Sequence, residues 1–364
     1  MFGVRIFFVS LQKIAKFLPK KNKNIKSVNI TAIKVKICLF IGMLIGIPTH
    51  LQGQDDRPYT YISVGGMVGF SHYQGDLDNN GFDFGNLLGQ KGGQGVGNPF
   101  LLMRPAFGAY LNVHFHQYMY VRFTLSQGFV GANDRHGSTD ARRTRNLHFR
   151  SPISEVSAQW CYEFLGKRIL YQARPDNRTK VSPYFFGGVA GFWFNPQAKP
   201  DKAWLEQYPG LFPDERWVNL QPLGTEGQFL QSARDYYQKP YSRFAVAFPV
   251  GMGLRFKITR EIDLSFEVGY RITLTDYIDD VSGNVAGTYY PNPNDFLQAG
   301  AIKSMLFSDR SVGMTGYETR ANRGDPNQND MYVFTMVSLG YIIDKNDRCA
   351  DGHDKRRKAR SIWW

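Results

Sequence analysis

Apolar and polar residues alternate with a period of two in eight segments of the chain, which is the pattern of a β-strand with one apolar face. In residues 105–116, Phe107, Leu111 and Phe115 share one face, whereas Tyr110 and Asn112 lie on the other. The segments are 59–70, 105–116, 118–129, 148–164, 182–194, 243–256, 261–272 and 331–342. The sequence therefore predicts an all-β chain of eight strands, each long enough to cross a bilayer at a tilt.

The connections between these segments differ in length in a regular way. His116 and Gln117 join the second and third segments, residues 257–260 join the sixth and seventh, and residues 165–181 join the fourth and fifth. The other connections are long and span 71–104, 130–147, 195–242 and 273–330. A soluble sandwich rarely carries several loops of this length, whereas short turns at one end and long loops at the other are typical of outer-membrane barrels.

Two further patterns favour a membrane barrel over a soluble sandwich. Glycines such as Gly65, Gly69 and Gly253 recur on the less apolar face, where a narrow lumen needs small residues. Aromatic residues crowd the strand ends, as in the girdles of membrane barrels; they include Phe115, Phe164, Tyr184, Phe194 and Tyr341. The predicted fold is an eight-stranded antiparallel transmembrane β-barrel with short periplasmic turns, long outer loops and both termini in the periplasm.

The first 53 residues have the organisation of a secretory signal peptide. A basic stretch ends at Lys36, and an apolar run of eleven residues, 37–47, follows it. A membrane-spanning helix needs about 20 apolar residues, so a retained anchor is the weaker alternative. We expect cleavage near Gly53 and delivery to the cell outer membrane. The predicted organisation is a signal peptide in 1–53, the barrel in 54–344 and a basic C-terminal tail in 345–364.

The formal net charge of +13 belongs to the two ends of the chain. Residues 1–53 hold nine basic residues and no acidic one, and residues 345–364 hold seven basic and three acidic ones. Since the whole chain has 44 Lys and Arg and 31 Asp and Glu, residues 54–344 hold 28 of each sign. A nucleic-acid-binding protein needs a basic face to neutralise phosphates, so no nucleic-acid partner is expected for this neutral body.

Several charged residues fall on the predicted inward face of the strands. Charges that faced hydrocarbon would cost several kcal/mol, whereas charges in a narrow lumen pair with one another. We therefore predict a structural ion-pair network in the lumen, made by Arg122, Arg150, Glu155, Arg255, Glu267 and Arg271. A conduction path is the alternative interpretation of the same residues.

Short motifs in the long segments resemble one known family. The most specific are Leu-Gln-Pro-Leu-Gly-Thr-Glu-Gly-Gln at 220–228 and Thr-Asp-Tyr-Ile-Asp-Asp-Val-Ser at 275–282. The others lie at 104–108, 146–152, 182–184, 194–198, 308–311, 323–325 and 330–332. In this order, over about Tyr59 to Ile343, they resemble the PorG-like outer-membrane β-barrel family of Bacteroidota.

The resemblance implies a role in type IX secretion. Members of the family are associated with that system and are linked to a periplasmic ring built by a lipoprotein and its partner. The expected partners are therefore outer-membrane lipid and the periplasmic ring proteins. The basic tail from Lys345 departs from the family pattern; it is interpreted as a segment that lies on an anionic membrane, docks an acidic partner or is simply solvated.

The outer loops carry the candidate site residues. They are Trp217, Glu226, Asp276, Asp279, Asp280, Asp309 and Arg310. Asp276, Asp279 and Asp280 offer three carboxylates within five residues, which would suit Ca²⁺, although their spacing is not that of an EF-hand. The preferred interpretation is that they accept backbone N–H bonds and order the loop, so no metal is expected. The aromatic loop 195–242, with Trp204, Tyr208 and Phe212, is predicted to pack as a lid over the barrel mouth.

No catalytic group is expected. His114, His116, His136 and His148 do not converge in the predicted topology, and no nucleophile with a base and an orienting group can be assembled from them. Arg323-Gly324-Asp325 matches an adhesion tripeptide, but we expect a turn with solvated charges. The chain is therefore predicted to be a non-enzymatic barrel without a cofactor that anchors or organises a type IX secretion assembly through periplasmic contacts. The alternative is a small-solute pore or a surface-binding barrel.

Overall fold

The described part of the chain is the barrel and much of its loops. The structure is a computed structural model that describes residues 61–77, 103–116, 118–136, 140–165, 181–230, 239–259, 261–282, 292–311, 323–325 and 327–343. The predicted signal peptide, 1–53, and the basic tail, 345–364, lie outside the described residues.

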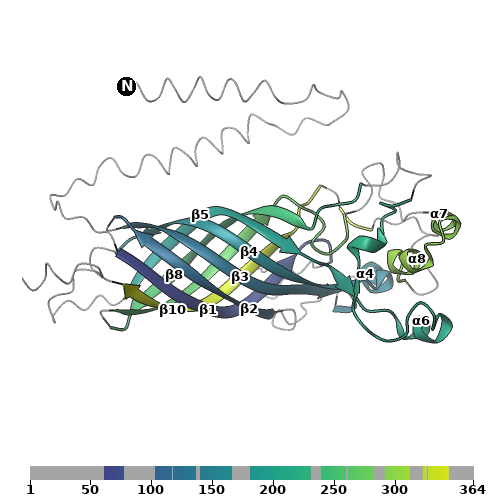
Figure 1. The fold of residues 1–364 in the computed structure, drawn as a ribbon, viewed down its shortest axis with the longest axis horizontal. Helices are drawn as coiled ribbons and strands as arrows, with labels where there is room; N and C mark the ends of the chain where they lie inside the picture. The colour runs from purple at the N-terminus through teal and green to yellow at the C-terminus, as the bar shows by residue number, and fades with distance from the viewer. Residues whose placement is uncertain are drawn as a thin grey trace, which may run out of the picture. The chain divides into compact units, whose positions relative to one another are not determined.

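Eight long strands form one closed antiparallel sheet (Figure 1). They are β1 (Tyr61–Gln74), β2 (Arg104–His114), β3 (Met119–Asn133), β4 (His148–Glu163), β5 (Val181–Phe194), β8 (Phe244–Lys257), β9 (Ile262–Thr273) and β10 (Met331–Ile343). Each pairs with its neighbour in this order, and β1 pairs with β10 from Ile62↔Ile343 to Gln74↔Met331. The sheet therefore has no free edge among these strands, and the predicted eight-stranded barrel is confirmed.

The two ends of the barrel differ as the sequence predicts. Residues 115–118 join β2 to β3 and residues 258–261 join β8 to β9 at what we call the short-turn end. The opposite, loop end carries the short elements (Figure 1). These are η4 (Asp134–His136), α4 (Asp140–Arg145), β6 (Gln197–Ala198), α6 (Lys202–Gln207), β7 (Val218–Asn219), η5 (Gln221–Leu223), α7 (Pro293–Gln298) and α8 (Ile302–Ser308). None of the helices in the described residues is long and apolar enough to cross a bilayer.

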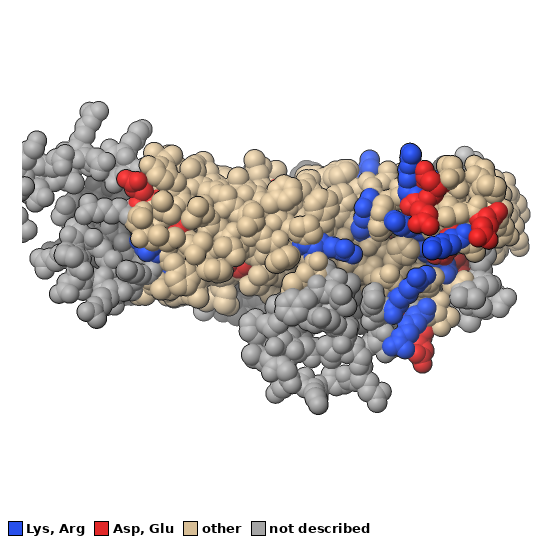
Figure 2. Space-filling model, turned by 90° about the horizontal axis from the view of Figure 1, so that it is seen from below, with Lys and Arg blue, Asp and Glu red and all other residues tan. Residues whose placement is uncertain are grey.

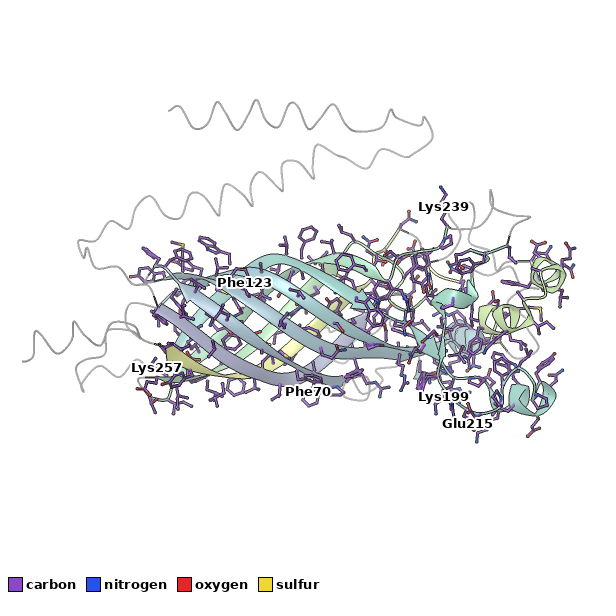
Figure 3. The ribbon with its side chains drawn as sticks, viewed as in Figure 1. Phe70, Phe123, Lys199, Glu215, Lys239 and Lys257 are labelled. Atoms are coloured by element: carbon purple, nitrogen blue, oxygen red, sulfur yellow. The ribbon has the colours of Figure 1, made fainter. Side chains whose placement is uncertain are left out.

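The outer wall of the barrel is apolar. Phe70 and Phe123 extend away from the wall (Figure 3), and Val68, Leu125 and Val156 are each more than 60% exposed. Their neighbours one position along each strand point into the lumen and are buried. The predicted alternation is therefore confirmed, with the apolar face turned outwards, which is the face that a transmembrane barrel presents to lipid.

The aromatic residues at the strand ends divide between the two faces. Phe115, Phe164 and Tyr341 are between 40% and 50% exposed on the outer wall, as a girdle requires. Tyr184 and Phe194 are buried in the barrel, so their assignment to the girdle is wrong. Both lie at even positions of β5, whose even residues point inwards, and the period of two decides their side.

Inward-facing glycines make room for large lumen side chains. A Cβ atom on Gly253 would lie 2.5 Å from the ring of Tyr184, and one on Gly269 would lie 2.5 Å from a guanidinium nitrogen of Arg271. The glycines therefore leave space for the large side chains that fill the lumen, as the sequence predicts.

A small hydrophobic core lies in the loops. Trp204 of α6 and Phe212 pack against Phe307 of α8, with ring centroids 5.4–6.0 Å apart. The β5–β8 and β9–β10 connections are thus held together by aromatic packing, and these aromatic residues serve the packing of the loops on one another.

Candidate functional site

Ion pairs cross the lumen at three levels. Nearest the short-turn end, Arg255 of β8 donates to Glu163 of β4 at 2.9 Å and to the Tyr120 hydroxyl at 2.8 Å. Asp263 lies 4.0 Å from the same guanidinium. All four side chains are nine-tenths buried or more.

The middle level joins opposite walls. Arg122 of β3 donates to Glu267 of β9 at 2.5 Å, and the Tyr184 hydroxyl donates to the same carboxylate at 2.7 Å. Arg122 also donates to Asn112 at 3.1 Å. Because strands β2, β1 and β10 separate β3 from β9 around the wall, this pair spans the lumen rather than running along it.

The third level lies towards the loop end. Arg271 of β9 lies 3.3 Å from Glu155 of β4, and the Tyr332 hydroxyl donates to that carboxylate at 2.7 Å. The three levels together place charged and phenolic groups across the lumen. In such buried pairs each charge depends on its partner, because removing one member would leave the other unpaired in a region without bulk water.

The predicted lumen network is present for five of its six members. Arg122, Glu155, Arg255, Glu267 and Arg271 are all buried in it. The period of two also places Glu163, Asp263, Tyr120 and Tyr184 on the inward face, and these members were missed. These residues can be found from the sequence if the two-residue alternation is applied to every polar side chain of a strand.

Arg150 is the member that does not belong to the lumen. Its side chain is exposed, donates to Gln197 at 3.0 Å and stacks over Trp217 with 4.0 Å to the ring centroid. Residue 150 has the parity of outward-facing Val156, not that of Glu155, so the prediction that it lines the lumen is wrong.

Arg323 joins the two most specific motifs at the loop end. Its guanidinium donates to Thr225 at 2.8 Å and lies 3.4 Å from Glu226 and 3.9 Å from Asp280. Asp280 also accepts hydrogen bonds from the hydroxyls of Thr225 and Tyr241. We call Asp76, Glu226, Asp276, Asp279, Asp280, Arg323 and Asp330 the rim cluster.

Arg145 ties the remaining long connections to this cluster. It pairs with Asp134 through two contacts of 2.7 and 2.8 Å. It also donates to the backbone carbonyls of Arg323 and Asp76. Together, Arg145 and Arg323 contact residues from all four long connections: β1–β2, β3–β4, β5–β8 and β9–β10.

Asp279 and Asp330 share one hydroxyl. The Tyr73 oxygen lies 2.7 Å from Asp279 and 2.6 Å from Asp330. A phenol has one proton to donate, so one of these carboxyl groups must itself carry a proton for both contacts to be hydrogen bonds. Burial raises the pKa of both carboxyl groups well above the usual range of aspartic acid, and the neighbouring carboxylates Asp330, for Asp279, and Asp276, for Asp330, add to the shift, which agrees with a shared proton.

Burial also raises the pKa of two further candidate aspartates, Asp276 and Asp280. Burial raises the pKa of Asp276 to about 9, more than the nearby Ser282 lowers it. Burial raises the pKa of Asp280 to about 6, although Arg323 opposes the shift. Asp276, Asp279 and Asp280 face different partners, and no group of three or more His, Cys, Asp or Glu in the described residues could hold a metal ion. Asp279 accepts the Val281 backbone N–H and Asp280 accepts two hydroxyls, so these two aspartates order the loop.

Asp309 and Arg310 stabilise the loop core. Arg310 is buried, lies 2.8 Å from Asp201, and stacks over the rings of Trp204 and Phe307 at 5.2 and 5.4 Å. Asp309 accepts hydrogen bonds from the backbone and hydroxyl of Ser311. Both residues position the loop rather than face outwards.

The Arg323-Gly324-Asp325 tripeptide is not a solvated turn. Arg323 is 3% exposed within the rim cluster, so the prediction of solvated charges is wrong for it. A side chain on Gly324 would collide with Asp76, which accepts a hydrogen bond from the Asp325 backbone. The arginine is committed to the interior of the loops, which removes the charge that an adhesion motif would display.

His148 lies at the opposite end of the barrel from His114 and His116. His114 is buried in the lumen and stacks on Tyr120 near the short-turn end, His116 lies in the β2–β3 turn, and His148 begins β4 at the loop end. His148 accepts a hydrogen bond from the Lys199 backbone. The side chain of His136 lies outside the described residues.

The rim cluster contains residues that sequence reasoning did not single out. Arg323 and Asp330 lie in quoted motifs, and Asp76 lies outside them, but nothing in the sequence separates a buried loop charge from a solvated one. The positive φ of Asp280, 67°, is likewise a product of the folded loop.

No protein-family model matches the chain, and no curated protein matches it. Similar solved structures include Neisserial surface protein A, at 7% identity over 78% of this chain and 96% of that chain, with a TM-score of 0.30. The outer membrane protein OprG from Pseudomonas aeruginosa is 10% identical over 79% and 97%, with a TM-score of 0.33. Ail of Yersinia pestis, bound to the heparin analogue sucrose octasulfate, is 10% identical over 78% and 97%, with a TM-score of 0.28. Because these identities and TM-scores are low, the fold assignment rests on this chain's own strand pairing. The resemblance to PorG-like barrels stays a prediction.

Proposed function

We propose that this protein is a non-enzymatic outer-membrane β-barrel that anchors or organises a type IX secretion assembly through its periplasmic end. The apolar outer wall supports the membrane location, because a closed barrel satisfies every strand hydrogen bond within the hydrocarbon. The resemblance of the 220–228 and 275–282 motifs supports the association with secretion.

The single observation that best supports a structural role is the set of ion pairs that fills the lumen. Cation–carboxylate pairs cross it at three levels, from Arg255–Glu163 through Arg122–Glu267 to Arg271–Glu155. A barrel of eight strands is just wide enough for side chains to fill it. A filled lumen and loops joined to one another favour a rigid anchor over a transporter.

The short-turn end is the surface that would meet periplasmic partners. In this topology it carries the β2–β3, β4–β5 and β8–β9 connections, and Lys257 lies at this end, opposite the helices (Figure 3). Glu261 is an exposed charge in the β8–β9 connection. A partner of the barrel would therefore contact small turns rather than the long loops.

The test is recovery of ring proteins with the tagged barrel from detergent-solubilised envelopes. We expect the wild-type barrel to bring down the periplasmic ring proteins, and Glu261→Lys to lower their recovery. Arg216→Glu reverses an exposed charge at the loop end and is the matched control. Recovery of the intact barrel without any ring protein would overturn the proposed role. Normal secretion of type IX cargo by a deletion strain would do the same.

A small-solute pore is the second candidate, because the lumen keeps polar atoms that make no hydrogen bond within the described residues. They include the hydroxyls of Thr124, Ser126 and Ser338. Steady single-channel conductance of the wild-type barrel in a planar bilayer would favour this function.

A further inference from the structure

Basic and aromatic side chains gather just beyond the apolar wall on the β4–β5–β8 side of the barrel. We call Arg150, Trp193, Lys199, Trp217 and Arg243 the basic ledge. Figure 2 shows, on the face in view, charged residues of both signs gathered towards the loop end, whereas most of the barrel wall carries no charged residue.

The strand register fixes the height of the ledge. Trp193 is 39% exposed and pairs with Ser154 of β4 on one side and with Phe244 of β8 on the other. Phe244 and Val156 are both more than 60% exposed and belong to the apolar wall. Arg243 directly precedes Phe244, and Arg150 lies four residues beyond Ser154 towards the loops. The cations therefore begin where the apolar wall ends.

Aromatic rings hold the cations in place. The Arg150 guanidinium lies 4.0 Å from the Trp217 ring centroid, and the Lys199 ammonium lies 5.6 Å from the same ring. The Arg243 guanidinium lies 5.5 Å from the Trp193 ring. Stacking on a ring orients the guanidinium while leaving its N–H fork free to bind an anion.

No carboxylate among the described residues neutralises the positive charges of the basic ledge. Arg150 donates a hydrogen bond to the neutral amide of Gln197, and Arg243 donates one to the neutral amide of Asn195. Neither arginine nor Lys199 forms an ion pair with a described carboxylate, in contrast to Arg145, Arg310 and Arg323. Arg104 adds repulsion, because its charge acts on Arg150. Arg150 and Lys199, which lie over the same Trp217 ring without a counter-charge, therefore form a site for an anion.

We propose that the basic ledge binds the phosphate groups of a lipid in the membrane leaflet at the loop end. The proposal rests on the membrane location given above. The apolar wall below the ledge would take the acyl chains, the tryptophans would lie at the interface, and Arg150 and Arg243 would each bind phosphate oxygens. Continuity with the apolar wall selects a membrane lipid as the occupant, because the same surface contacts both parts of one amphipathic molecule.

The test compares two lipids that differ only in phosphate. The full chain, purified in detergent micelles, is titrated with bisphosphorylated lipid A and with dephosphorylated lipid A of the same acyl chains, and binding is read by native mass spectrometry. We expect the wild type to bind the phosphorylated lipid at least about tenfold more tightly. We expect Arg150→Gln with Arg243→Gln to weaken that binding roughly thirty-fold while leaving the dephosphorylated lipid unaffected.

The matched control removes two other cations of the outer loops, in Arg143→Gln with Lys303→Gln, and should retain the preference. Heat-modifiable gel mobility checks that each variant keeps its barrel. Equal affinity for the two lipids, or equal losses in test and control variants, would overturn the proposal. So would complete displacement of the lipid by an equal concentration of inorganic phosphate, which would assign the site to free phosphate. None of these outcomes depends on the periplasmic ring, so they are distinct from a failure of the secretion role.

Discussion

Arg122 is enclosed by groups from several strands of the barrel. Its partners Glu267 and Asn112 come from β9 and β2, and the ring of Tyr110 lies 5.0 Å from its guanidinium. A charge in such a place is stable only while its partner remains, since removal of one member leaves the other unpaired in a region from which water is excluded. The middle level of the lumen is therefore the position most sensitive to a single substitution.

Arg122→Met should lower the stability of the barrel by about 3–5 kcal/mol, because it leaves the Glu267 carboxylate buried without its cation. The measurement is urea unfolding in detergent, followed by heat-modifiable gel mobility. The double variant Arg122→Met with Glu267→Met should recover most of the loss, since it removes both charges. A single variant as stable as the wild type would contradict the ion-pair interpretation.

Asp276 should make the order of the loops depend on pH. Its pKa of about 9 in the folded loop lies above the ordinary 3.8, so the folded state holds a proton that the unfolded loop releases. The resulting stabilisation is full below pH 3.8 and is lost as the pH rises towards 9. Asp276→Asn keeps the side chain neutral and should remove this dependence.

Limited proteolysis near residues 275–282 measures the effect of Asp276. We expect the cleavage rate of the wild type relative to Asp276→Asn to rise between about pH 6 and about pH 9. The ratio cancels the pH dependence of the protease and of the other carboxyl groups. A ratio that stays constant over this range would show that Asp276 does not hold a proton in the folded loop.

At the scale of elements, Arg145 and Arg323 add polar long-range contacts to the apolar packing of the loops. The long connections are mostly irregular, and short helices such as α6 and α8 have little intrinsic stability. Each of the two arginines contacts several connections and so joins them to one another. The aromatic core around Trp204 and Phe307 adds a second point of attachment.

Arg323→Gln should loosen the loop end while the barrel remains folded. The substitution removes the cation beside Glu226 and Asp280, and leaving buried groups unsatisfied costs about 1–3 kcal/mol each. We expect cleavage within 220–230 and 275–282 to become at least about tenfold faster, with unchanged heat-modifiable mobility. Arg143→Gln removes an exposed arginine paired with Asp140 and should have little effect. Equal protection of the two variants would contradict a central role for Arg323.

The strands could be predicted from sequence because their faces are decided by one local rule. Lipid on one side and a filled lumen on the other select apolar and polar residues in strict alternation, as in Phe123 against Arg122. The predictions for Arg150, Tyr184 and Phe194 are wrong because they follow from charge or aromatic character and not from the position of each residue in the two-residue period of its strand. The rim cluster could not be predicted in the same way, because Asp76 and Arg323 are 247 sequence positions apart, Glu226 lies between them in sequence, and all three meet only through the closed barrel.

At the scale of the whole molecule, the barrel should be electrically silent. The wild type should show no steady conductance in a planar bilayer, because the three ion-pair levels block the lumen. Replacing the paired residues of all three levels with alanine, at Arg122, Glu155, Glu163, Arg255, Glu267 and Arg271, should give measurable current if the barrel still folds, which gel mobility checks. Conductance in the wild type equal to that of the variant would contradict a closed lumen.

Closure of the sheet by β1 and β10 also bears on how the protein is made. Ile62 is the partner of Ile343, so the first and last described strands are neighbours although almost the whole barrel lies between them in sequence. Such a pairing has the highest loop-closure cost that the chain can present, and it comes last in any order that begins with local hairpins. Until it forms, β1 and β10 each expose an unpaired edge that hydrocarbon cannot satisfy. The chain therefore needs protection, or help with insertion, until its last strand has arrived.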